Sequence, residues 1–299
     1  MIKLKDFLKN GIIYIGFVSI LLITTLNIIF SAKIYNGMSE NILMNKNSFI
    51  FILSFIIIII GIYYIISKVE KIQLKYKTKR IIFISLIIVY AILQILWINI
   101  RNANPNYDQY YVYETAIKLK DADESLIGNE YLQMYPQQIS TASFYAIFLK
   151  LFNTTNVKIL QYLNVIANVF TIIGLYFIAK YIANGNNKFS KVSFAIIAFT
   201  FTALPLLSIF IYGDLISLPF SVFAVYFAMK YGKENKNKYI ILSALCMSMA
   251  YFLRMNNLIF IIAIFIYLFL GLLAILPYKS KKKCIVKIIF IITFILISK

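Results

Sequence analysis

Two acidic residues and one arginine are the side chains in this sequence best suited to chemistry. Asp108 lies in a long polar segment, Asp214 interrupts an apolar run in LSIFIYGDLISLPF, and Arg254 lies between two apolar runs in YFLRMNNLIF. One carboxylate can deprotonate an acceptor hydroxyl, while a second can orient the acceptor or hold a divalent metal against a phosphate. A guanidinium group binds phosphate in a bidentate manner. Together these residue types favour transfer of a group from a phosphorylated lipid.

Each of the three residues also has a purely structural explanation. Asp108 follows a turn at Pro105 and can cap a short helix over about 109–120. Asp214 can cap a helix that starts at Leu215, because Gly213 lets the backbone turn there. Arg254 can be an interfacial anchor whose charged end reaches water. The types and spacing of the residues leave both explanations open.

A polar and aromatic cluster lies further along the same segment. It reads YLQMYPQQ and contains Tyr131, Tyr135, Gln137 and Gln138. Aromatic faces together with amide side chains suit a sugar, although aromatic belts at membrane interfaces have the same composition. The cluster adds candidate substrate-binding residues to the two acids.

The elements that must position these residues are transmembrane helices. Hydrophobic residues make up 62% of the 299 residues and charged residues only 14%, with a mean hydropathy of +0.83. Soluble domains are nearer half apolar and a quarter charged. Several apolar runs have the length of about 20 residues that crosses a bilayer, and no strand-like alternation is present. We predict an all-α polytopic bundle of about nine spans, over 11–32, 48–67, 81–100, 158–180, 191–211, 215–230, 239–253, 256–276 and 285–298.

Composition also excludes several kinds of site. The chain has no histidine, which excludes histidine-based catalysis, histidine-ligated haem and most zinc sites. Its two cysteines, Cys246 and Cys284, form neither a disulfide framework nor a redox pair. No glycine-rich phosphate loop occurs, so we expect no nucleotide or flavin. The high net charge of +19 comes from short loops between spans and does not predict nucleic-acid binding.

Lysine counts predict the topology. With the N-terminus in the cytoplasm, the inner loop 68–80 holds six basic residues. The next inner loops hold three, four and five lysines if 136–152 does not span, whereas all twelve face outward if it does. The positive-inside rule therefore predicts that 136–152 is an interfacial or re-entrant helix on the outer face. Segment 101–157 becomes a large outer loop, and Asp108, Asp214 and Arg254 all fall at the outer surface.

The organisation along the chain follows from this topology. We predict two N-terminal transmembrane helices with a basic cytoplasmic loop over 1–80, and a transmembrane module over 81–277 whose outer loop 101–157 is catalytic. Residues 278–299 form a basic loop and the start of a further helix that stops at IITFILISK. We therefore expect a truncated product, a fragment or a short form.

The order of three motifs resembles the GT-C superfamily of membrane glycosyltransferases. The motifs are PNYDQYYVYETAIKL in the first outer loop, YLQMYPQQ after it, and YGDLISLPF in the next outer loop. They are similar to those of protein O-mannosyltransferases and aminoarabinose-transferase-like bacterial enzymes over roughly 80–260. The resemblance implies that Asp108 is the catalytic base and that Asp214 is a second catalytic acid that binds substrate or a divalent metal such as Mg or Mn.

The sequence departs from that pattern in two respects. Many members have two adjacent acids in the first loop, whereas Gln109 follows Asp108 here, which argues against metal binding in that loop. Members are also usually much longer. We place Gln109 with Arg254, Tyr131, Tyr135, Gln137 and Gln138 as candidate substrate-binding residues.

We therefore expect a multi-pass protein of a bacterial plasma membrane that moves a sugar from a polyprenyl-phosphate donor to a glycan, lipid or protein acceptor outside the cytoplasm, with inversion. Two alternatives from other classes stay open. A transporter or flippase of lipid-linked sugar would need polar groups near the bilayer midplane, but the charged residues here lie at span ends. An inactive structural subunit would bind the lipid phosphate without turnover.

Overall fold

The computed structural model describes residues 2–34, 42–72, 75–123, 130–182, 194 and 203–272. The chain divides into two compact units, Met1–Gln73 and Leu74–Lys299. Both are built almost wholly from helices, which confirms the predicted all-α membrane fold. The predicted division at residue 80 stays a prediction, and the predicted last segment 278–299 lies outside the described residues.

The first unit is two apolar helices joined through a short hairpin. Helix α1 spans Ile2–Ile29 and α2 spans Phe49–Lys71, and their apolar windows are long enough to cross a membrane. Within these windows no side chain is buried, as lipid-facing helices require. Strands β1 (Phe30–Ile34) and β2 (Ile42–Lys46) pair antiparallel between them. The sequence-based span 11–32 is therefore wrong at its end, because residues 30–32 satisfy their backbone in this hairpin.

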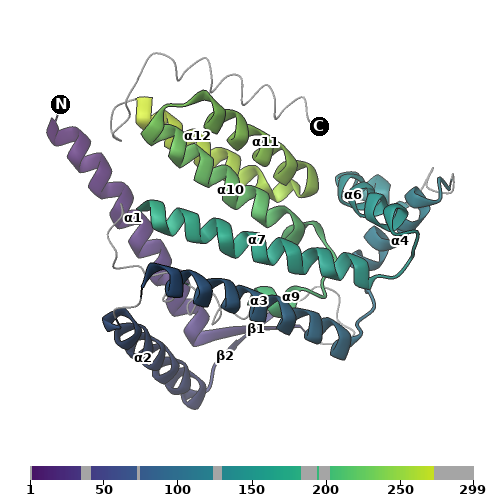
Figure 1. The fold of residues 1–299 in the computed structure, drawn as a ribbon, viewed down its shortest axis with the longest axis horizontal. Coiled ribbons are helices and arrows are strands. Elements are labelled where there is room, and N and C mark those ends of the chain that lie inside the picture. The colour runs from purple at the N-terminus through teal and green to yellow at the C-terminus, as the bar shows by residue number, and fades with distance from the viewer. Residues whose placement is uncertain are drawn as a thin grey trace. The chain divides into compact units, whose positions relative to one another are not determined.

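The second unit contains the long helices that carry the candidate site. Helices α3 (Tyr76–Arg101), α7 (Lys158–Ile182) and α10 (Gly213–Glu234) each have the length and apolarity of a span. Figure 1 shows α7 between α3 and α10, and α10 beside α11 (Asn237–Leu253) and α12 (Leu258–Leu272). Asparagines in the left-handed conformation end two of these helices, Asn102 after α3 and Asn235 after α10.

Two predicted spans are only partly within the described residues. Of 191–211, the structure describes residue 194 and 203–211, where a short helix α9 (Ala203–Leu207) gives way to non-helical backbone at 208–211. The predicted helix end at 211 is thus wrong. Span 256–276 corresponds to the 3-10 turn Met255–Asn257 and α12, described to residue 272, and 285–298 lies outside the described residues.

The long loop after α3 folds into three short helices. Helix α4 spans Asp108–Lys120, α5 spans Glu130–Met134 and α6 spans Gln138–Leu151. Helix α6 has 14 residues, too few to span a bilayer of about 30 Å. It packs against α4, and buried side chains of both join a core that also contains Tyr212, Ile216 and Leu253. The loop helices are therefore fixed to one end of the helical unit.

A row of buried amides on α7 holds the non-helical segment before α10. Asn164 Nδ2 donates to the carbonyls of Ser208 and Phe210, at 3.1 and 2.9 Å. Gln161 Nε2 donates to the Ile209 carbonyl, and Asn168 Nδ2 donates to the carbonyl of Leu204 in α9, just before this segment. Irregular backbone at membrane depth must have its polar groups satisfied inside the protein. These amides therefore let the chain leave the helical form just before Asp214.

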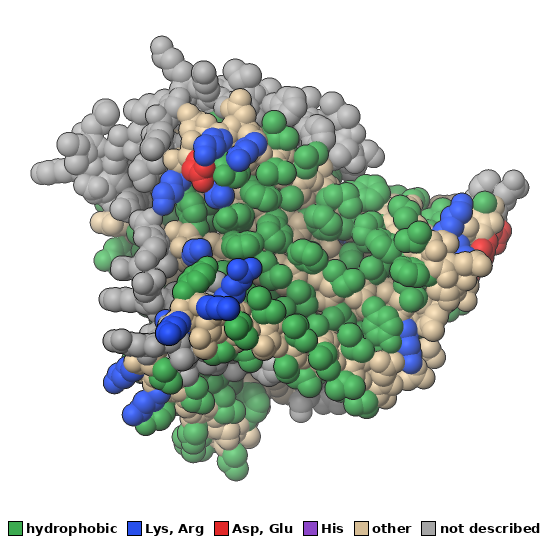
Figure 2. Space-filling model, in the orientation of Figure 1, with side chains coloured by type: hydrophobic (Ala, Val, Ile, Leu, Met, Phe, Trp, Pro, Cys, Tyr) green, Lys and Arg blue, Asp and Glu red, His purple; other side chains and the backbone are tan. Residues whose placement is uncertain are grey.

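The two ends of these helices differ in charge. Figure 2 shows apolar side chains over the middle of the visible face, with lysines gathered where α10 meets α11. Lys230, Lys233, Lys236 and Lys238 surround a single acid, Glu234, at that end. Asp108, Asp214 and Arg254 lie together at the other end. The predicted topology likewise places the three residues on one side of the membrane.

Candidate active site

Asp108 is the first residue of α4. The residue before it, Tyr107, takes the N-cap position with φ 51° and ψ −133°, a conformation that glycine favours and that strains a tyrosine. No side chain caps the helix, so the alternative of Asp108 as a simple N-cap is wrong. The Asp108 carboxylate instead accepts a hydrogen bond from the Tyr212 hydroxyl, at 3.4 Å. The backbone thus directs this acid toward another element.

Asp214 is the second residue of α10 and pairs with Arg254. Tyr212 takes the N-cap position without a side-chain capping bond, so Asp214 is not the cap either. Its Oδ1 accepts from Arg254 Nε at 2.9 Å, across 40 residues of sequence. A carboxylate in a first helical turn is also favoured by the helix dipole. The Arg254 side chain is directed toward Asp214 and Tyr212 of the protein, whereas the side chain of an interfacial anchor would be directed toward water.

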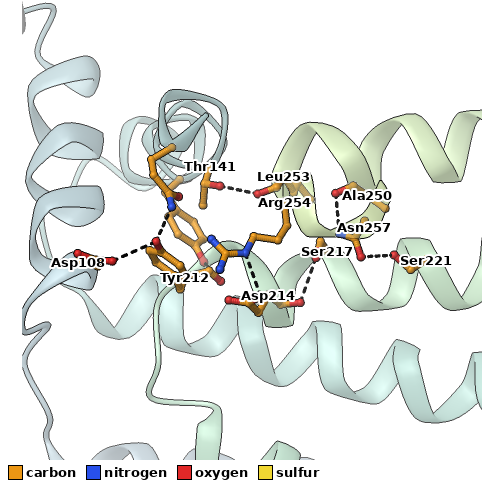
Figure 3. A network of polar contacts seen from close by, with 12 residues as sticks. Asp108, Thr141, Tyr212, Asp214, Ser217, Ser221, Ala250, Leu253, Arg254 and Asn257 are labelled. Carbon is orange, nitrogen blue, oxygen red and sulfur yellow. Dashed lines mark hydrogen bonds and ion pairs between the residues drawn. The ribbon is translucent and has the colours of Figure 1, made fainter. Parts of the chain in front are cut away.

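Tyr212 connects the two acids. Figure 3 shows its side chain between Asp108 and Arg254. Its hydroxyl donates to Asp108 and accepts from Gln138 Nε2. Its ring lies beneath the Arg254 guanidinium, with Cζ 4.3 Å from the ring centroid, a distance typical of a cation–π contact. Only 8% of Tyr212 is exposed, so these contacts hold it firmly.

A tight junction between α6, α10 and α11 fixes the geometry of this network. Thr141 Oγ1 donates to the Leu253 carbonyl at 2.5 Å, and a Cβ at Gly213 would overlap the same carbonyl oxygen. Asn257 Nδ2 donates to the Ala250 carbonyl, and its Oδ1 accepts from Ser221, which attaches the turn after Arg254 to α11 and α10 (Figure 3). Glycine at 213 is therefore needed for the close approach that joins Asp214 to Arg254.

Stacked tyrosines adjoin Asp108. The rings of Tyr111 and Tyr131 stack 4.6 Å apart, and Tyr135 lies 5.2 Å from Tyr131. Tyr131 is buried, and its hydroxyl has no hydrogen-bond partner among the described residues. Burial raises the pKa of that hydroxyl, and the nearby Tyr212 and Asp108 raise it further. The stacked tyrosines thus belong to the same cluster as Tyr212 and Asp108.

The three glutamines have different positions. Gln138 is buried and donates a hydrogen bond to the Tyr212 hydroxyl. Gln109 Oε1 accepts a hydrogen bond from the Ile211 backbone N–H and so connects α4 to the segment before α10. Gln137 lines a groove of about 590 Å³ between α6 and α11. The other lining residues are Pro136, Ile139, Ser140, Ser143, Tyr251, Phe252 and Met255. This groove runs beside the chain on both sides of Arg254 and has the volume of a ligand site.

The donor atoms around Asp214 do not fit a divalent cation. In the parts of the chain that the structure describes, no three acidic or cysteine side chains gather into a ligand set. Oδ1 of Asp214 is paired with the Arg254 guanidinium, and this positive charge would repel a metal ion. Metal binding by Asp214 stays a prediction from the resemblance, and the chemistry below uses none.

The structure adds functional candidates that the sequence did not single out. Tyr212 is one of 23 tyrosines, and nothing in its immediate sequence marks it. The α7 amides have a stronger sequence signal of a structural role, because Gln161, Asn164 and Asn168 recur at helical spacing within an apolar run. Arg254, Asp214 and Asp108, in contrast, are brought together as the lysine counts predicted.

Comparison with known proteins identifies the family of this chain. Residues 139–298, more than half of the chain, match the family model of dolichyl-phosphate-mannose-protein mannosyltransferase. The match contains Asp214 and Arg254 and begins after Asp108, which the structure joins to the matched part through Tyr212. Neither the curated proteins nor the solved structures gave a match. The chain therefore belongs to the dolichyl-phosphate-mannose-protein mannosyltransferase family, GT-C-type membrane glycosyltransferases that use a lipid-linked sugar donor.

Proposed function

We propose that the chain transfers a sugar from a polyprenyl-phosphate donor to an acceptor on the outer face of the membrane, with inversion. In one displacement the acceptor oxygen bonds to the anomeric carbon while the bond from that carbon to the phosphate oxygen breaks. The acceptor proton passes to the Asp108 carboxylate, and the polyprenyl phosphate leaves with the bonding electrons. A positioned general base typically contributes about 10²–10⁴-fold to such a step.

The observation that carries this proposal is that one acid is paired with a cation and the other is not. Within the described ranges Asp108 has no ion pair, and its side chain accepts a hydrogen bond from the Tyr212 hydroxyl. Asp214 is paired with a cation. The guanidinium occupies an oxygen of Asp214, whereas Asp108 has an oxygen that no cation occupies and that can accept the proton of an acceptor hydroxyl. Asp108 is thus the base in this proposal, and Asp214 acts by holding Arg254.

Arg254 is placed to stabilise the leaving phosphate. Asp214 engages its Nε, and among the described residues no hydrogen bond occupies its two terminal amino groups. A guanidinium presents several donors in a fixed fork that matches phosphate oxygens. Charge that develops on the phosphate as the bond breaks can therefore be stabilised by these amino groups.

The groove beside Arg254 suits the lipid portion of the donor. Its walls are mostly apolar, with Ile139, Phe252 and Met255 among them, and Ser140 and Ser143 add hydroxyls. An isoprenoid chain in this groove would bring its phosphate to the turn that carries Arg254. The stacked tyrosines on the other side of α6, next to Asp108, then face the sugar and acceptor.

The outer location rests on lysine distribution. The lysines at the α10–α11 turn lie at the end opposite the site, and the positive-inside rule places such a turn in the cytoplasm. Single cysteines at positions 121 and 235, introduced after replacing Cys246 and Cys284, test this with an impermeant thiol reagent in intact cells. We expect labelling at 121 only, and the reverse pattern would contradict the outer assignment.

The function itself is tested by in vitro transfer with a panel of polyprenyl-phosphate sugars, read by mass spectrometry. We expect Asp108→Asn to lower kcat at least about 100-fold. Asp121→Asn is the matched control, because Asp121 follows the same helix and is largely exposed beside Lys120. Full activity of the Asp108→Asn protein would remove Asp108 as the base, and no transfer by the wild type from any donor would contradict the proposal.

A further inference from the structure

The site contains one side chain whose contacts reach both halves of the proposed reaction. Tyr212 touches Asp108 with its hydroxyl and Arg254 with its ring, and the two contacts use different parts of the residue. Neither contact is local, since Asp108 is 104 residues away in sequence and Arg254 follows the next helix, α11. The acceptor side and the donor side of the reaction thus meet on a single buried tyrosine.

Three further contacts keep Tyr212 in one orientation. The Tyr145 hydroxyl donates to the Tyr212 backbone carbonyl at 3.2 Å, and Tyr145 is fully buried. Gln138, itself 3% exposed, donates to the Tyr212 hydroxyl. This donation leaves the hydroxyl proton free to point at Asp108. The absence of a Cβ at Gly213 lets the backbone after Tyr212 lie close against the Leu253 carbonyl at the end of α11.

We propose that Tyr212 is the positioning residue that aligns the base with the leaving-group cation, its hydroxyl orienting the Asp108 carboxylate and its ring holding the Arg254 guanidinium over the donor phosphate. This rests on the proposed function. A carboxylate that accepts at Oδ2 presents its other oxygen, Oδ1, to the acceptor hydroxyl. A guanidinium that is held over a ring and bonded at Nε keeps its terminal amino groups in one orientation.

The two contacts are separable by substitution. Tyr212→Phe removes the hydroxyl and keeps the ring, whereas Tyr212→Leu removes both. We expect Tyr212→Phe to lower kcat roughly tenfold with the donor KM within twofold of the wild type. We expect Tyr212→Leu to lower kcat similarly and to raise the donor KM roughly fivefold. The donor KM would therefore stay near the wild-type value in Tyr212→Phe and rise only in Tyr212→Leu.

Tyr239 provides the matched control at the lysine end. It is also 8% exposed, its ring has the Lys230 ammonium 4.6 Å from its centroid, and its hydroxyl accepts from that ammonium. Tyr239→Phe and Tyr239→Leu should leave kcat and the donor KM within twofold. Melting temperatures of all four variants in detergent separate a loss of folding from a loss of alignment.

Binding of polyprenyl phosphate without a sugar tests the ring contact independently of turnover. We expect Tyr212→Leu and Arg254→Gln each to weaken this binding, and the double variant to weaken it no more than Arg254→Gln alone, because the ring acts through the guanidinium. Wild-type affinity in Tyr212→Leu, or wild-type kcat in Tyr212→Phe, would overturn the proposal. Absence of transfer by the wild type would instead contradict the proposed function. The binding result would then still show whether the Tyr212 ring holds Arg254 for phosphate binding.

Discussion

The two ends of the α10–α11 pair use the same interactions for different purposes. At each end a cation lies over a tyrosine ring and pairs with an acid: Arg254 with Tyr212 and Asp214 at one, Lys230 with Tyr239 and Glu234 at the other. The lysine end pairs residues four apart on one helix. The arginine end pairs residues 40 apart and reaches a third element, α4, through Tyr212.

This difference separates local stability from assembly of a site. An i,i+4 pair at a helix end stabilises that helix slightly and is screened by salt. A pair that joins the start of one helix to the end of another fixes the position of both, so its loss changes every contact that depends on the alignment. We therefore expect equal chemical changes at the two ends to have unequal effects.

The largest contrast is expected for the two cations. Arg254→Gln should lower kcat/KM for the donor at least about 100-fold, because the leaving phosphate loses its cation and Asp214 loses its partner. Lys230→Gln should stay within twofold of the wild type. Initial rates over a range of donor concentrations measure both. Similar losses in the two variants would show that the ends do not differ as we describe.

The next contrast concerns two glycines in the same unit. Alanine at 213 would overlap the Leu253 carbonyl, which is backbone and cannot rotate away. Alanine at 174 would meet Val222 Cγ1 at 2.7 Å, a longer approach and to a side-chain atom rather than to backbone. We expect Gly213→Ala to cost about 1–3 kcal/mol and most of the activity, and Gly174→Ala to cost less.

Thermal unfolding in detergent together with the transfer assay measures this second contrast. Gly61, whose added Cβ would contact nothing within 4 Å, supplies a neutral alanine variant for reference. A Gly213→Ala protein with wild-type activity would mean that the close approach to Leu253 is not needed to align Asp214 and Arg254.

A smaller contrast is expected between two buried polar side chains. Asn164→Leu removes the donor of the Ser208 carbonyl and one of two donors of the Phe210 carbonyl, which also accepts from the Tyr212 backbone N–H. Both carbonyls lie in non-helical backbone between α9 and α10. Ser243→Ala removes a donor from the Ala224 carbonyl, which is inside α10. We expect roughly 1–2 kcal/mol for the first and under about 1 kcal/mol for the second.

Denaturation in mixed detergent measures these two changes, and Asn164→Leu should also lower the transfer rate, since the segment it holds leads directly into Tyr212 and Asp214. An equal loss of stability in both variants would indicate that the amides on α7 do not specifically support the non-helical segment.

The sequence was sufficient for most of the helices and for the meeting of the charged residues. Long apolar runs leave the chain no other way to satisfy its backbone in a bilayer, so α2, α3, α7 and α10 begin and end near the predicted residues. Lysine counts then decided which helix ends lie together. This placed Asp108 and Asp214 at one end, although no local pattern connects them.

The roles of individual residues could not be obtained in this way. Capping was the favoured structural alternative for both aspartates, but the strained backbone at Tyr107 and the Arg254 ion pair direct them elsewhere. Tyr212 acts entirely through contacts between distant segments, which neither composition nor spacing reveals. The β1–β2 hairpin was missed because an apolar run of helical length continues into its first residues.

The smallest effect is expected for the acid at the lysine end. Glu234 pairs with Lys230 at 3.6 Å and Lys236 at 2.9 Å, and its side chain is 30% exposed. Glu234→Gln should shift the melting temperature by about 1 °C or less and leave transfer unchanged, because exposed pairs gain little and salt screens them. Asp214→Asn, which removes the corresponding acid from the other end, should release Arg254 and lower transfer by an order of magnitude or more. If raising the salt concentration removed the difference between these two variants, the Asp214–Arg254 pair would be as weakly held as its counterpart, and the asymmetry between the two ends would no longer explain where the site lies.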